Sequence, residues 1–113
     1  MHEEVHPVVT IRLKHSSIVC DEQLSVLLHL VDETGSIQDS CQRMGISLPS
    51  AWYLLAQAED SLGVPLLRHH QGRSFLTEKG RNLMDGYDGF RAAVQEKADA
   101  HFASFLHTDE PSL

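Results

Sequence analysis

The stretch ISLPSAWYLLAQAEDSLGVPLL, residues 46–67, decides the fold. Ser47 is suited to cap a helix, and Pro49 falls in the first turn of that helix, where a missing backbone N–H costs little. Gly63 is suited to the left-handed residue that closes a helix. These signals predict one amphipathic helix between Ser47 and Gly63. Its expected buried face consists of Leu48, Ala51, Trp52, Leu55, Ala58 and Leu62.

The charge of this helix is unusual for a surface that contacts nucleic acid. From Ser47 to Leu67 the chain has no lysine or arginine, and it carries the acids Glu59 and Asp60. The whole chain of 113 residues has a net charge of −7. Residues 43–81 nevertheless hold five basic against three acidic side chains, a net charge of +2, and the remainder carries −9. The acidic excess therefore lies outside the central segment.

Two helices are predicted ahead of the central one. Asp21 is placed to cap the first, and Thr34-Gly35-Ser36 ends it and begins the second. Ser36 and Asp39 resemble a capping box, and Gly45 ends the second helix. Helical spacing marks the apolar faces of this pair, which consist of Leu24, Leu27, Leu28 and Val31, and of Ile37, Cys41 and Met44.

Strand signals flank the helices. Residues 8–14 alternate between apolar and polar side chains, which predicts one half-buried strand. The short apolar pieces PLLR and SFL surround residues 69–73, which predicts a hairpin with a polar tip.

A long amphipathic helix is expected from Thr77 to about Leu106. Its apolar residues recur at spacings of three and four, which is typical of helices that pair between two chains. The first two turns of this seam could instead pack on their own domain. The predicted dimer interface consists of Leu83, Tyr87, Phe90, Val94, Ala98, Phe102 and Phe105.

The expected organisation is mainly α-helical with a small β wing. It comprises an N-terminal arm with one strand (residues 1–20), a compact domain (21–80), a long dimerisation helix (78–106) and a tail (107–113).

One segment is similar to a known family. LLHLVDETGSIQDSCQRMGISLPSAWYLLAQAEDSLGVPLLRHHQGRSFLTEKGRNLM, residues 27–84, resembles the N-terminal domain of LysR-type regulators in the order of its glycine, serine, PLL and LTxxG signals. TIRLK (10–14) and SAW (50–52) resemble the DNA-binding domain of ModE, the molybdate-responsive regulator. The similarity covers about residues 8–95. It implies a winged helix-turn-helix, a homodimeric transcriptional regulator, and double-stranded DNA as partner.

The chain departs from the family pattern at the central helix. The family usually places glutamine after the capping serine and a basic residue further along, whereas this chain has Leu48, Tyr53, Leu54 and Ala56. No effector or molybdate-binding domain follows within the 113 residues, so we expect a regulator without an effector domain.

Candidate DNA contacts on the helices follow from helix chemistry. Ser36 and Ser47 lie at helix N-termini, whose free N–H groups attract phosphate, although simple capping explains them equally. On the outward face of the central helix, Ser50 and Gln57 could meet base edges, and Tyr53 a phosphate or a thymine methyl. The alternative is a solvated face, or one that binds protein.

The densest basic cluster follows the central helix. Arg68, Arg73, Lys79 and Arg81 are candidates for phosphate contacts, and Arg73 could also enter a minor groove. A solvated wing is the alternative, in which Arg68 pairs with an acid.

Other functional classes find little support. No segment is long and apolar enough for a membrane span, and the acidic start does not resemble a signal peptide, so we expect a cytoplasmic protein. Cys20 and Cys41 lie far apart and indicate reduced thiols. The eight histidines show no metal-binding spacing, so neither a metal nor a cofactor is expected. No catalytic motif is present, so we do not expect an enzyme.

A second functional hypothesis is a protein–protein adaptor that docks through Tyr53 and Leu54. Surface potential separates the two hypotheses. A continuous positive surface over residues 36, 47–57 and 68–81 would favour DNA, whereas an apolar patch beside Glu59 and Asp60 would favour a protein partner.

Overall fold

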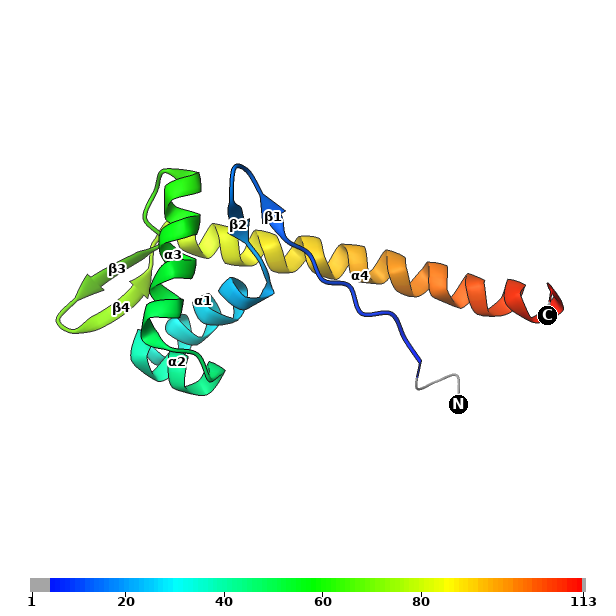
Figure 1. Ribbon diagram of the computed structural model, residues 1–113, viewed down its shortest axis with the longest axis horizontal. Helices are drawn as coiled ribbons and strands as arrows, with labels where there is room; N and C mark the ends of the chain where they lie inside the picture. The colour runs from blue at the N-terminus through cyan, green and yellow to red at the C-terminus, as the bar shows by residue number, and fades with distance from the viewer. Residues whose placement is uncertain (1–4, 113) are drawn as a thin grey trace.

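A computed structural model describes residues 5–112, with side chains described up to residue 106. Short helices and a β-hairpin gather at one end, and the last helix extends far beyond them (Figure 1). This arrangement is a winged helix-turn-helix with a long C-terminal helix, as the sequence predicts. Within the described range, no helix is both long and apolar enough to cross a membrane. In chain order the elements are β1 (Leu13–Lys14), β2 (Ile18–Cys20), α1 (Glu22–Thr34), α2 (Ile37–Met44), α3 (Leu48–Leu62), β3 (Leu67–His70), β4 (Arg73–Leu76) and α4 (Glu78–Ser112).

Local capping signals define the ends of α1, α2 and α3. The side chains of Asp21, Ser36 and Ser47 accept hydrogen bonds from the backbone N–H three residues ahead, at 2.9, 3.0 and 3.2 Å. Each helix then closes on a left-handed glycine with a φ near 70°. All these caps confirm the sequence predictions.

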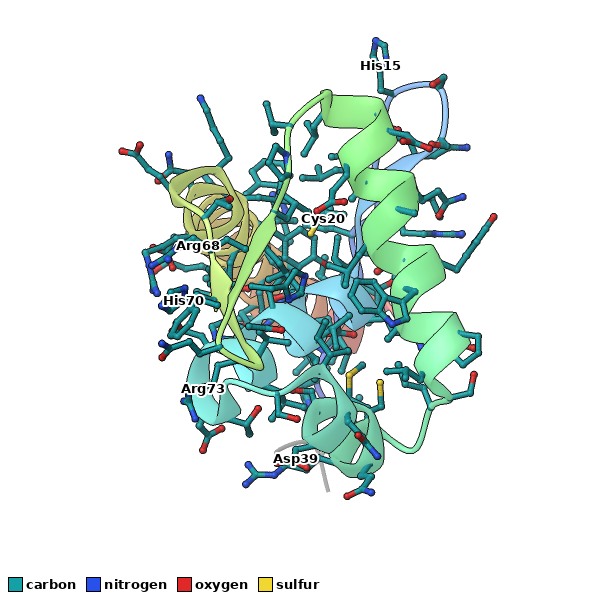
Figure 2. The ribbon with its side chains drawn as sticks, turned by 90° about the vertical axis from the view of Figure 1, so that its left-hand side faces the viewer. His15, Cys20, Asp39, Arg68, His70 and Arg73 are labelled. Carbon is teal, nitrogen blue, oxygen red and sulfur yellow. The ribbon has the colours of Figure 1, made fainter. Side chains whose placement is uncertain are left out.

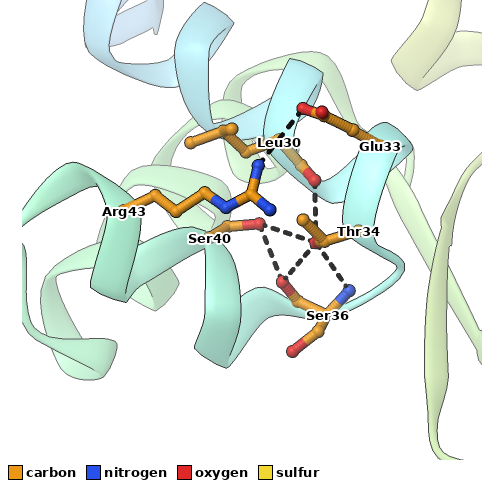
Figure 3. A network of polar contacts seen from close by, with 6 residues as sticks. All are labelled: Leu30, Glu33, Thr34, Ser36, Ser40 and Arg43. Carbon is orange, nitrogen blue, oxygen red and sulfur yellow. Dashed lines mark hydrogen bonds and ion pairs between the residues drawn. The ribbon is translucent and has the colours of Figure 1, made fainter.

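The turn between α1 and α2 is held by a hydroxyl network (Figure 3). The Thr34 hydroxyl lies 2.8 Å from the Leu30 carbonyl and accepts from the Ser36 N–H at 3.1 Å. The buried Ser40 hydroxyl donates to the Ser36 carbonyl at 2.7 Å. Beside the network, Arg43 of α2 pairs with Glu33 of α1 at 3.5 Å. Side-chain hydrogen bonds and one ion pair therefore connect α1, the turn and α2.

The wing is a tight hairpin of β3 and β4. His70 pairs with Arg73, so the tip is only Gln71-Gly72 rather than the predicted residues 69–73. Both tip residues have positive φ, 51° and 78°, which is the geometry of the two-residue turn that matches strand twist. His69, His70 and Arg73 are therefore strand residues with defined directions.

The N-terminal arm differs from the predicted strand. Only Leu13–Lys14 pairs, and its partner is β2, a second strand that the sequence analysis did not anticipate. Residues 7–11 instead run beside α4. Gln95 accepts from the Val9 N–H at 2.9 Å and donates to the Pro7 carbonyl at 2.8 Å. Helix side chains thus satisfy backbone groups that no neighbouring strand can reach, while the alternating exposure of residues 8–14 is kept.

The start of α4 belongs to the core of its own chain. Tyr87 is only 2% exposed, and its hydroxyl donates to the Ile11 carbonyl at 2.7 Å. Leu83 packs against the same core. These two residues were predicted in the dimer interface, and the structure places them in the domain because the core itself covers the first turns of α4.

The far end of α4 also departs from expectation. The helix continues to Ser112, beyond the predicted end near residue 106. Once a helix has formed, each added residue gains a hydrogen bond, so a polar sequence alone does not stop it.

Candidate nucleic-acid interface

The solvent face of α3 is more aromatic than the sequence suggests. Ala51, Leu55 and Ala58 form its buried stripe. Trp52, predicted in the core, is 44% exposed and lies 5.9 Å, centroid to centroid, from the His69 ring of the wing. Trp52 lies at the edge of the buried stripe and packs on the wing instead of entering the core. Leu48 and Leu62, also predicted buried, are each 40% exposed at the two ends of the helix.

The predicted base-reading residues lie together on α3. The amide of Gln57 donates to the Tyr53 hydroxyl at 3.1 Å, one helical turn away. Nearer the N-terminus, the Ser47 hydroxyl donates to the Ser50 hydroxyl at 2.9 Å. Ser47, Ser50, Tyr53 and Gln57 therefore present uncharged hydrogen-bond donors and acceptors on one face of the helix.

The two helix N-termini are not equivalent as phosphate sites. At α2, Asp39 lies in the first turn beneath Ser36 and opposes an incoming anion. At α3, the first turn after Ser47 has no acid. The α3 terminus therefore offers an anion the more favourable field.

An apolar patch beside Glu59, which would have favoured a protein partner, is not found on α3. Glu59 turns toward the loop that enters the wing, where its carboxylate accepts from the Leu66 N–H at 2.8 Å. Leu54, expected to be exposed, is half-buried against the core. A shallow depression does lie beside it, and Ile46, Pro49 and Tyr53 line this depression together with Gln23 of α1. The apolar surface thus lies near the N-terminus of α3, away from Glu59.

The wing has two chemically different faces. Strand pairing places His69 opposite Ser74, and Arg68 opposite Phe75, so alternate residues face opposite sides. The contact between His69 and Trp52 identifies one side as the α3 side. Arg68, His70 and Arg73 project from the other side (Figure 2). We call this side the outer face of the wing.

The basic residues that were predicted to contact phosphate lie in different surroundings. Lys79 is exposed at the start of α4, whereas Arg81 forms a two-pronged contact with Asp32 of α1 at 2.7 and 3.4 Å. This hydrogen bond raises the pKa of the Arg81 guanidinium above its ordinary value. The guanidinium carbons of Arg68 and Arg73 lie 5.0 and 5.9 Å from the centroid of the Phe75 ring. Arg68 and Arg73 thus lie on the side of the hairpin opposite the one that contacts α3.

Sequence reasoning missed Trp52, His69 and Asp32 as parts of this surface. The period-two alternation within β3 and β4 would have put Arg68 and Arg73 on one face, had the two-residue turn been recognised from Gln71-Gly72. No local signal indicates the partner of Arg81, because Asp32 lies 49 residues away in the chain.

Comparison with known proteins agrees with this architecture. The model of the family described as bacterial regulatory helix-turn-helix protein, lysR family, matches residues 22–81. That range begins with α1, includes α3 and the wing, and ends in the first turn of α4. The comparison with curated proteins gave no match to the chain.

Proposed function

The chain belongs to the lysR family of bacterial regulatory helix-turn-helix proteins, and on this basis we propose that it is a transcriptional regulator that binds double-stranded DNA as a homodimer. The observation that carries the proposal is the free face of α3, which presents the neutral hydrogen-bonding groups of Ser50, Tyr53 and Gln57 beside an unopposed helix N-terminus. Such a face suits contact with base edges in a major groove.

Each part of the interface has its own role in this proposal. The N–H groups at the α3 terminus, next to Ser47, hold a phosphate and set the register, and those at the α2 terminus, next to Ser36, make a weaker contact because Asp39 opposes the anion. Gln57 reads one base pair, and Tyr53 contacts a phosphate or a thymine methyl. Trp52 and His69 link the helix to the wing. Because α3 carries no positive charge, long-range attraction comes from Lys79 and from the wing residues Arg68, Arg73 and the neighbouring Arg81.

The distal part of α4 supports the dimer. Phe90, 52% exposed, and the half-buried Val94, Ala98 and Phe102 recur along one side of a helix that leaves the body of the domain (Figure 1). The chain is 63 Å long but only 28 and 21 Å across. A second copy would cover this apolar row, and Phe105 extends it. Pairing would place two copies of α3 for successive major-groove contacts, about 34–36 Å apart.

The direct test is the binding of genomic DNA fragments at about 50 mM salt. Gel retardation and the fluorescence of Trp52, the single tryptophan, both measure this binding. Gln57→Ala should relax preference at one base pair, at a cost of about 1–3 kcal/mol. Arg73→Ala and Lys79→Ala should weaken binding to every sequence and lower the salt slope by about one.

Lys97→Ala is the matched control, since this exposed lysine of α4 lies outside the residues assigned to DNA contact. It should leave both affinity and salt slope unchanged. Absence of retardation of any fragment by the wild-type protein would contradict the proposal. The adaptor hypothesis would then rest on the depression beside Tyr53 and Pro49.

A further inference from the structure

A polar cavity of about 170 Å³ lies between the outer face of the wing and the end of α1. Arg68, Arg73 and Phe75 line it from the wing, Asp32 and Gly35 from α1 and its cap, and Arg81 from α4. This volume is below the roughly 300–1,000 Å³ of sites for drug-sized ligands, so only a small group fits.

The walls of the cavity are held by the backbone. The Ser74 N–H of the wing donates to the Gly35 carbonyl at 3.0 Å, which ties β4 to the end of α1. The Arg73 guanidinium lies directly over Gly35, where an added Cβ would come within 2.4 Å of Nη2. The arginine is therefore placed by the close approach of wing and turn, rather than projecting freely into solvent.

The cavity has an excess of positive charge. Asp32 is the one carboxylate among its lining residues, and it is engaged by Arg81. Asp85 of α4 also faces Arg81. Among the described residues, neither Arg68 nor Arg73 takes part in an ion pair, yet both guanidinium groups approach the same Phe75 ring. Three guanidinium groups thus line one cavity with a single carboxylate, and that carboxylate is paired with Arg81.

From this geometry we propose that the pocket formed by Arg68, Arg73 and Arg81 binds a compact oxyanion of the phosphate class. Guanidinium groups match the oxygens of such an anion with paired N–H donors, and the Phe75 ring lies beside those of Arg68 and Arg73. The anion would screen the repulsion between Arg68 and Arg73. It would also bridge the wing to α1 and α4.

The phosphate group has two possible sources, a free anion or the backbone of bound DNA. Arg68, Arg73 and Phe75, which line the pocket from the wing, lie on its outer face, opposite the side that contacts Trp52 of α3. A free anion would act as a ligand that fixes the wing, whereas a DNA phosphate would be a flanking contact. Only the second source rests on the function proposed above.

Calorimetric titration of the full chain with inorganic phosphate, at constant ionic strength in chloride buffer, tests the site. We expect one site per chain with a Kd of about 1 mM or tighter. Arg68→Ala and Arg73→Ala should each weaken binding at least tenfold. Arg43→Ala is the control, because this exposed arginine pairs with Glu33 outside the pocket, and it should not change the affinity.

Asp32→Asn provides a test in which the variant is expected to bind phosphate more tightly than the wild type. It removes the competing carboxylate and should tighten phosphate binding several-fold, so it remains decisive if an arginine variant fails to fold. Binding that does not saturate, or that Arg43→Ala weakens as much as Arg68→Ala, would overturn the proposal.

Repeating the titration with saturating duplex DNA identifies the source. Loss of phosphate binding in the presence of DNA, together with weaker DNA binding by Arg68→Ala, assigns the site to a backbone phosphate. Unchanged phosphate binding assigns it to a free anion. If no DNA binds at all while phosphate still does, the pocket stands and the regulatory function fails.

Discussion

At the scale of single residues, Gly80 shows how closely α4 approaches the chain before the wing. A Cβ at Gly80 would lie 2.2 Å from the carbonyl oxygen of Leu66. The same carbonyl accepts from the Thr77 N–H at 2.9 Å, and the Thr77 hydroxyl caps the helix by accepting from the Gly80 N–H at 3.0 Å. The glycine is therefore required by backbone contact rather than by its φ.

Gly80→Ala should destabilise the protein by about 1–3 kcal/mol, because the new methyl group must push two backbone segments apart. Urea denaturation measures the change. Gly89→Ala, in the same helix and with nothing within 4 Å of its added Cβ, should instead gain about 0.5–1 kcal/mol from helix propensity. Equal effects of the two substitutions would contradict the crowding argument.

Cys20 makes stability depend on alkaline pH. Burial, and then the nearby Asp21 and Asp88, raise the pKa of its thiol from 9.0 to about 12. The unfolded chain loses this proton above about pH 9 while the folded chain keeps it, so stability is full below pH 9 and falls as pH rises toward 12. Burial also raises the pKa of Tyr87, which adds to the same trend.

Cys20→Ala should flatten this decline. Denaturation midpoints measured from neutral pH to about pH 10.5 should fall less steeply for the variant, even though the lost side chain lowers its stability at every pH. A slope identical to that of the wild type would show that the thiol does not titrate on unfolding.

At the scale of elements, the N-terminal arm is held by side chains of α4 rather than by a strand. Two hydrogen bonds from Gln95 and one from Tyr87 fasten residues 7–11, and Asp88 links α4 to Ser25 and His29 of α1. The long helix is thus anchored on two sides before it leaves the domain.

Gln95→Ala should release the arm without unfolding the domain. Arg12 and Lys14 are exposed trypsin sites in this segment, and we expect cleavage there to accelerate several-fold as the local opening free energy falls. Limited proteolysis followed by mass spectrometry measures the rate. Gln57→Ala, which removes an amide from α3 instead, should leave it unchanged.

At the scale of the whole molecule, the elongated shape bears on the proposed dimer. The distal half of α4 lies beyond the core, and its apolar row from Phe90 to Phe102 runs through exposed and half-buried positions. Burying such a row against a second copy removes apolar area from water. A homodimer of this kind should persist at tens of micromolar protein, and lower, if it is to function.

Replacing both Val94 and Phe102 with glutamate should yield monomers, because buried like charges oppose the pairing. Sedimentation gives the mass, and circular dichroism should show that α1, α2 and α3 remain folded. A wild-type protein that sediments as a monomer at tens of micromolar would contradict the dimer.

Part of the candidate site follows from local chemistry alone. The caps at Ser36 and Ser47, and the cluster of Ser50, Tyr53 and Gln57 on one helix face, depend on spacings of three and four residues and are readable from the sequence. The division of the basic residues between two sides of the wing depends on a two-residue turn and on long-range packing. To predict on which side each basic residue lies, one needs the register in which β3 pairs with β4, and neither strand alone specifies that register.

The sequence by itself determined where the helices α1, α2 and α3 begin and end, because caps and left-handed glycines act through hydrogen bonds within a few residues. Helical spacing also marked most of their buried faces, whereas tertiary structure decided which distant residues the remaining side chains contact. Ala51, Leu55 and Ala58 fill the buried side of α3, whereas Trp52 packs on His69 of the wing. Likewise, the core encloses Tyr87, and the approach of the wing to Gly35 places Arg73. The positions of these side chains depend on close packing between segments that are distant in sequence, and those segments come into contact only when the chain folds.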